Sequence, residues 1–128
     1  MLMEYAVWWD AVHNVRLLVE DLARRFNRAR VDYEYYSRLL KGLDREVGED
    51  VEYDIANTER ALARFRRRLM DIGEEATALI PIVDALIACG ESIPQDKRLE
   101  NHTHLITRLE EMKKELERIT EYTKKLEE

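Results

Sequence analysis

The sequence predicts an all-α protein: an elongated, antiparallel three-helix bundle with coiled-coil-like packing. Apolar residues recur every three or four positions over three long stretches, which is the repeat of helices packed side by side. The 128 residues include only four glycines and two prolines, which is too few turn-forming residues for a many-stranded sheet protein. Because the three repeats span nearly the whole chain, we expect residues 1–128 to form a single helical domain.

The first predicted helix covers residues 3–47. Alternating steps of four and three residues meet only apolar or aromatic side chains, namely Trp8, Val12, Val15, Val19, Leu22, Phe26, Ala29, Tyr33, Tyr36, Leu40, Leu43 and Val47. We call such a row of residues the seam of its helix. A seam with a 3.5-residue spacing indicates one long helix packed against others. Gly48 follows at a position where helices commonly end.

The second predicted helix covers residues 50–89. Its seam consists of Val51, Ile55, Thr58, Leu62, Phe65, Leu69, Ile72, Ala76, Leu79, Val83 and Leu86. The link from the first helix is short enough to require an antiparallel hairpin, which folds about residue 49 and sets Phe65 opposite Tyr33. Pro81 lacks a backbone donor and clashes with the preceding turn, so we expect a kink or a break there.

The third predicted helix covers residues 95–127, with Pro94 near its first turn. Its seam is His102, Leu105, Leu109, Met112, Leu116, Ile119, Thr123 and Leu126. This helix is shorter than the other two, so the tip of the hairpin, around residues 40–55, should protrude or be covered by another chain. In helix number and direction the pattern resembles spectrin-like three-helix coiled coils, without sharing a specific motif.

Charge and cysteine content restrict the surroundings of the protein. The net charge of −6 argues against bulk nucleic-acid binding, which favours basic domains. Cys89 is the single cysteine and no signal peptide is recognisable, so we expect a reducing, cytoplasmic location. The longest nearly uncharged stretch, residues 76–89, is shorter than the roughly 20 residues that cross a bilayer, so we expect no membrane association. Abundant Arg and Glu with a single Gln are typical of a thermophile.

One end of the predicted rod is too apolar for a monomer. Residues 76–89 have apolar side chains all round the helix, and the hairpin places them beside residues 2–9. An apolar patch of this kind indicates an interface, most simply a symmetric homodimer. The predicted interface residues are Trp8, Trp9, Ile80, Ile82, Val83 and Ile87. The alternative is a break at Pro81, after which the end of the helix folds over the bundle as a local cap.

The middle of the rod carries outward-pointing arginines on the first two helices. We call these residues the arginine belt: Arg24, Arg28, Arg60, Arg64 and Arg67. Glutamates of the third helix could form ion pairs at this level, most readily with the seam-flanking residues Arg25, Arg30, Arg66 and Arg68. The belt residues are less easily paired in this way, and the alternative is that they bind an anionic partner such as nucleic acid or an acidic protein surface.

Catalytic and metal motifs are scarce. No phosphate-binding glycine loop, nucleophile elbow, zinc-spaced cysteines or paired carboxylates occur. We therefore predict no catalytic residue, no metal and no cofactor. His13 and His104 fall near the same end of the rod, but His13 points outward and a metal needs three or four converging ligands. A buried, hydrogen-bonded His102 is expected near that end.

Arg98 and His104, with five residues between them, form one motif with a catalytic counterpart. Their spacing resembles the Arg-x(4–6)-His signature of HEPN-type ribonucleases, small helical domains that usually dimerise. The resemblance implies His104 as general base on the RNA 2′-hydroxyl and Arg98 as stabiliser of phosphate charge.

The sequence as a whole favours a non-catalytic helical scaffold, adaptor or assembly subunit that acts through protein–protein interaction and self-association. The alternatives are polyanion or nucleic-acid binding through the arginine belt, and HEPN-like RNA cleavage.

Overall fold

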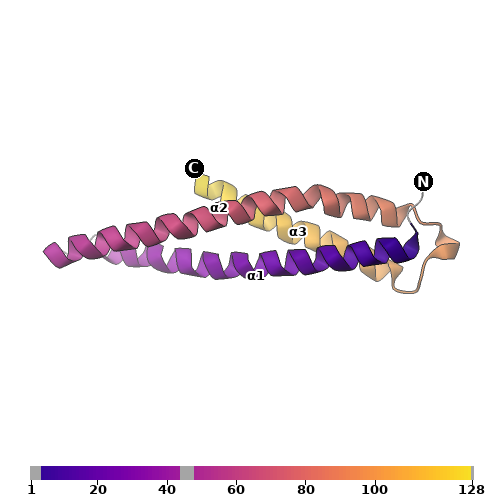
Figure 1. The fold of residues 1–128 in the computed structure, drawn as a ribbon, viewed down its shortest axis with the longest axis horizontal. Coiled ribbons are helices and arrows are strands. Elements are labelled where there is room, and N and C mark those ends of the chain that lie inside the picture. The colour runs from indigo at the N-terminus through magenta and orange to yellow at the C-terminus, as the bar shows by residue number, and fades with distance from the viewer. Residues whose placement is uncertain (1–3, 44–47, 128) are drawn as a thin grey trace.

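The computed structural model describes residues 4–43 and 48–127. Three long helices and one short 3-10 turn follow one another as α1 (Tyr5–Leu43), α2 (Glu49–Glu91), η1 (Gln95–Lys97) and α3 (His102–Glu127). Figure 1 shows α1 and α2 as a long antiparallel hairpin, with α3 returning along it parallel to α1. No strand occurs in the described ranges, and the predicted all-α three-helix bundle is confirmed.

The core follows the predicted seams. Every buried residue of α1 is a seam residue, from Trp8 to Ala29. In α3 the buried residues are His102, Leu109, Met112, Leu116, Ile119 and Thr123, again all on the seam. Periodicity therefore identified the residues that face the interior, because side chains three and four apart share one face of a helix.

The predicted pairing of α1 with α2 is also confirmed. Arg25 forms a salt bridge with Glu75 at 2.9 Å, close to the alignment expected for a fold about residue 49. Phe65 stacks on Tyr36 with ring centroids 5.6 Å apart. This contact lies one helical turn nearer the tip than the predicted partner, Tyr33.

Two predictions about helix boundaries need correction. Of the kink or break expected at Pro81, the break is absent, since α2 continues through it to Glu91, and Figure 1 shows one uninterrupted ribbon that curves gently. Pro81 has no backbone N–H, so the carbonyl of Thr77, four residues earlier, lacks its usual helical donor. Both residues are exposed, so water can hydrogen-bond this carbonyl instead and the helix can continue. The third helix begins at His102 instead of residue 95, because Pro94 and Arg98 adopt extended ψ angles of 141° and 138°. Residues 3 and 44–47 of the predicted first helix lie outside the described residues.

The hairpin extends beyond the end of α3. The side chain of Arg66 in α2 donates a 3.2 Å hydrogen bond from Nε to the carbonyl of Leu126, in the last turn of α3. Past this level only two helices remain, and we call residues 35–43 and 49–65 the arm (Figure 1). Several of its seam residues are only partly buried, namely Tyr36, Leu40, Val51, Ile55, Leu62 and Phe65.

Candidate functional site

Two of the six predicted interface residues lie in the core. Trp8 and Val83 each have 0% of their surface exposed. The Trp8 indole nitrogen donates a hydrogen bond to the carbonyl of Leu86 at 2.8 Å, and its ring packs 5.1 Å from that of His102. The structure thus places Trp8 and Val83 inside the protomer, where they are unavailable to a surface interface.

Of the other four, the two exposed residues line separate hollows. Trp9 is 41% and Ile82 46% exposed, while Ile80 and Ile87 are half-buried. Trp9 faces hollows bordered by α3 and the segment before it. Ile82 lines a separate groove of about 230 Å³ with Leu18 of α1. Trp9 belongs to α1 and faces α3, whereas Ile82 belongs to α2 and faces α1. These two residues therefore do not share one patch.

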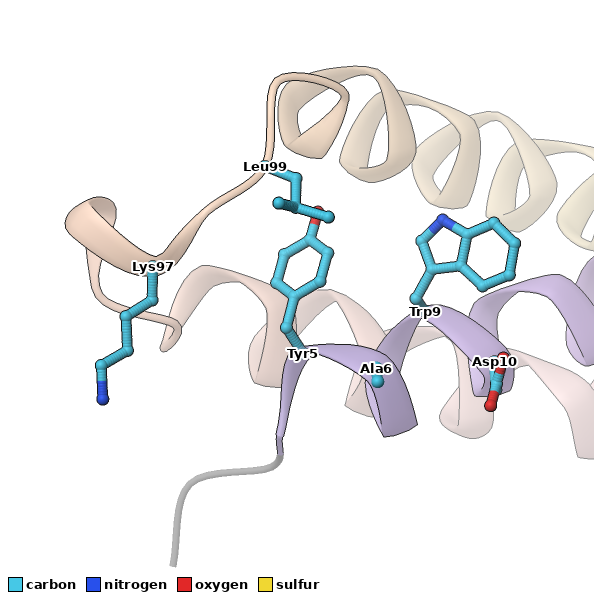
Figure 2. Close-up of a pocket in the computed structure, with 6 residues that line it drawn as sticks. All are labelled: Tyr5, Ala6, Trp9, Asp10, Lys97 and Leu99. Atoms are coloured by element: carbon cyan, nitrogen blue, oxygen red, sulfur yellow. The ribbon is translucent and has the colours of Figure 1, made fainter.

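An apolar hollow of about 410 Å³ lies at the start of α1, lined by Tyr5, Ala6, Trp9, Asp10, Lys97 and Leu99. Figure 2 shows the rings of Tyr5 and Trp9 rising from α1 toward the segment that carries Leu99, while Lys97 and Asp10 point away from it. With apolar walls and its charged groups turned outward, this hollow offers hydrophobic contact and little polar recognition.

A second hollow, of about 190 Å³, lies between α1 and α3. We call it the basic pocket, and it is lined by Trp9, Val12, His13, Arg16, Asn101, His104, Leu105, Arg108 and Met112. The His13 ring stacks almost parallel to the Trp9 indole, at 9° with centroids 5.8 Å apart. The predicted proximity of His13 and His104 is thus confirmed, whereas the sequence did not identify the pocket. The available signal was a pair of His and Arg residues on each helix, three or four positions apart.

The arginine belt remains on the surface. All five of its residues are exposed; Arg24 lies 3.8 Å from Asp21 and Arg60 bonds Asn57 at 3.2 Å. Among the ion pairs within residues 4–43 and 48–127, none links the belt to the glutamates of α3. The belt is therefore not ion-paired with the third helix in the described part of the chain, which agrees with the outward direction of its residues.

Arg25, next to the belt, is engaged differently. Its guanidinium bonds Glu75 at 2.9 Å and Asp21 at 3.0 Å. The hydrogen bond with Glu75 is the main reason that the pKa of Arg25 is raised, and Asp21 adds to it. The positive charge of Arg25 is thus balanced by two carboxylates of the hairpin.

Arg98 and His104, the residues of the ribonuclease-like motif, have different surroundings. Arg98 donates from Nε to the carbonyl of Ile93 at 2.8 Å and from Nη2 to that of Glu91 at 3.0 Å. These bonds satisfy carbonyls at the end of α2 and hold the segment before α3 against them. His104, by contrast, lines the basic pocket.

His102 is buried, as predicted, with 5% of its surface exposed. Burial lowers the pKa of its imidazole and the nearby charge of Arg98 lowers it further, although a hydrogen bond with the backbone of Gly90 acts in the opposite direction. Its Nδ1 atom has no hydrogen-bond partner within the described residues. A neutral imidazole is therefore part of the packing between Trp8 and α3.

Comparisons with protein-family models, curated proteins and solved structures found no match to this chain. Within residues 4–43 and 48–127, no helix combines the length and apolar character needed to span a bilayer. The same part of the chain has no cluster of three or more His, Cys, Asp or Glu side chains suited to a metal ion.

Proposed function

We propose that this chain is a non-catalytic helical assembly module that binds a second copy of itself through the arm. The observation that supports the proposal is the missing third helix. Along most of the rod the seam is enclosed by three helices, but Tyr36, Leu40, Ile55 and Leu62 of the arm remain half-exposed. A second arm packed on this side would complete a four-helix bundle and cover them.

The open side of the arm is well shaped for close helix packing. Ala56 and Ala63 lie three and two heptads before Thr77, whose hydroxyl is 3.5 Å from that of Thr120 in α3. They therefore belong to the face of α2 that α3 covers farther along the rod. Two small side chains beside Ile55 and Leu62 allow a partner helix to approach closely, as at other tightly packed helix pairs.

The charges of α2 favour an antiparallel arrangement of the two arms. Its acidic residues Asp50, Glu52 and Asp54 are near the tip, whereas Arg60, Arg64 and Arg67 of the belt are nearer the base. In an antiparallel dimer the acidic tip of each copy lies beside the arginines of the other. A parallel dimer would set like charges against each other. The antiparallel pair is closed by a two-fold axis, which limits assembly to a dimer.

The first experiment is the molar mass in solution, measured by light scattering behind size exclusion. The native chain should be a dimer. The packing surface of the arm is tested by Ala56→Glu combined with Ala63→Glu, which should yield a helical monomer. Ala78→Glu combined with Ala88→Glu is the matched control, because both alanines are exposed on α2 outside the arm, and it should remain dimeric. A native monomer at high concentration would refute the proposal.

A charge-swap experiment tests the antiparallel orientation. One variant carries Asp50→Lys, Glu52→Lys and Asp54→Lys, and a second carries Arg60→Glu, Arg64→Glu and Arg67→Glu. Each alone should be monomeric, because its tip and base then have the same sign of charge. Mixed together, the two should form a heterodimer that weakens with added salt. If the mixture stays monomeric while the native chain dimerises, the antiparallel arrangement is wrong.

The absorbance ratio of the same chromatographic peak separates this function from polyanion binding. Protein free of nucleic acid is expected. A high 260/280 nm ratio that disappears in the Arg60→Glu, Arg64→Glu, Arg67→Glu variant would favour the belt as a nucleic-acid surface instead.

A further inference from the structure

We propose that the basic pocket between α1 and α3 binds the phosphate group of a small phosphomonoester. Four basic side chains line it, His13 and Arg16 from α1 and His104 and Arg108 from α3, and none of its nine lining residues is acidic. The chain has 27 acidic residues and a net charge of −6. The charged side chains of this hollow are therefore all positive, whereas the net charge of the chain is negative.

Helix periodicity explains why these groups converge. His13 and Arg16 are three residues apart and His104 and Arg108 four apart, so each pair shares one helix face. The start of α3 lies beside the start of α1, and the two helices run parallel (Figure 1). Both pairs therefore border the same hollow. A ligand there is contacted from two helices at once, as expected for specific binding of a compact anion.

The floor of the pocket is apolar. Val12 and Met112 are 2% and 7% exposed, and Leu105 is half-buried beside them. Low polarity on one side strengthens the attraction between an anion and the surrounding cations. At the roughly 30 Å³ that a water molecule occupies in the liquid, about 190 Å³ accommodates about six waters. That space suits a phosphate group with part of its organic substituent.

The donor set matches phosphate chemistry. A guanidinium presents paired N–H groups that fit phosphate oxygens, and imidazole N–H groups donate further hydrogen bonds. The amide of Asn101 adds a donor just before the first turn of α3, where the helix dipole also favours negative charge. Arg16 forms a salt bridge with Glu20, with 3.7 Å between Nε and the carboxylate oxygen, a distance too long for a hydrogen bond. The Trp9 indole, stacked on His13, gives an aromatic edge for an organic substituent.

Phosphate binding can be followed by NMR on the full-length protein at constant ionic strength. Inorganic phosphate and adenosine monophosphate are the two probes. Ring signals of His13 and His104 should shift with saturation, whereas the signal of His102, buried outside the pocket, should not. Tighter binding of the nucleotide would show that the substituent contributes, and equal binding would show that the phosphate group alone is recognised.

Variants connect the binding to the pocket. Arg16→Gln and Arg108→Gln should each weaken binding by about tenfold or more, the effect of losing a charge-assisted hydrogen bond. Arg118→Gln, at an exposed position of α3 outside the pocket, is the matched control and should bind normally. The proposal fails if neither probe saturates, if both pocket variants bind like the native chain, or if only a short RNA binds.

The pocket lies outside the arm, so this proposal and the proposed self-association are tested independently. Loss of phosphate binding in Arg108→Gln should leave the molar mass unchanged, and the Ala56→Glu, Ala63→Glu monomer should still bind phosphate.

Discussion

The indole nitrogen of Trp8 donates a 2.8 Å hydrogen bond to the carbonyl oxygen of Leu86, 78 residues later in the chain. This bond joins the first turn of α1 to the end of α2. The same indole packs so closely on Gly90 that a Cβ atom there would lie 2.5 Å from the Trp8 ring. Gly90 is therefore required for the approach of Trp8 to α2, and not for ending the helix, which continues to Glu91.

Replacing Trp8 by Phe should destabilise the protein by about 1–3 kcal/mol. The substitution keeps an aromatic ring but removes the donor to Leu86 and leaves space in a fully buried site. Urea denaturation followed by circular dichroism measures the change. Trp9→Phe, at an exposed position one residue along, should change the free energy of unfolding by less than about 0.5 kcal/mol. Equal effects of the two substitutions would contradict the role given to this hydrogen bond.

Gly73→Ala should destabilise the contact between α2 and α3. A Cβ atom at residue 73 would lie within 2.2 Å of Oγ1 of Thr123, so the helices must separate or the threonine must move, at about 1–3 kcal/mol. Gly42→Ala is the matched control, because nothing lies within 4 Å of its Cβ position. Because residue 42 lies in the last turn of α1, the substitution should leave the stability unchanged or raise it by up to about 0.5 kcal/mol. Thermal unfolding of both variants gives the comparison, and a stabilised Gly73→Ala protein would refute the close approach.

Stability should fall on mild acidification because of His102. Burial lowers the pKa of this imidazole in the folded state below its ordinary value of 6.5. Below that value the unfolded chain binds the proton more readily than the folded chain, so the free energy of unfolding decreases as pH falls from about 7 toward the folded pKa. Urea denaturation across this range should show the decrease in the native chain and in the exposed control His13→Gln. A His102→Gln variant with the same pH dependence as the native chain would disprove the assignment.

Arg98→Ala should weaken the junction between α2 and α3. The guanidinium holds two backbone carbonyls, at Ile93 and Glu91, and hydrogen bonds from a charged donor contribute about 1.5–3 kcal/mol each when one partner is removed. Arg98→Lys should recover only part of the loss, since an ammonium cannot reproduce the planar fork. Chemical denaturation measures both, with Arg118→Ala as an exposed control of little effect.

Helix periodicity predicted more of this structure than of its functional surfaces. Rows of apolar residues from Trp8 to Ala29 and from Leu109 to Thr123 marked the core because burial follows helical spacing. The same reasoning assigned Trp9 and Ile82 to one patch, whereas they face different hollows. It also placed an α-helix over residues 95–101, where only Gln95–Lys97 form a 3-10 turn and Arg98 is extended. The predictions were therefore wrong for side chains that flank the seam and for the segment between α2 and α3 that is not α-helical.

The sequence alone determines the three helices, their direction and the residues that face inward, because each of these follows from spacing along a local segment. Only the tertiary structure decides which residues beside the seams are covered, since that depends on the helix lying next to them. Packing buries Trp8 against Leu86, leaves the arm without a third helix, and brings His13 and Arg16 to the same pocket as His104 and Arg108. Each of these outcomes joins residues from separate helices, whose relative rotation no local repeat specifies.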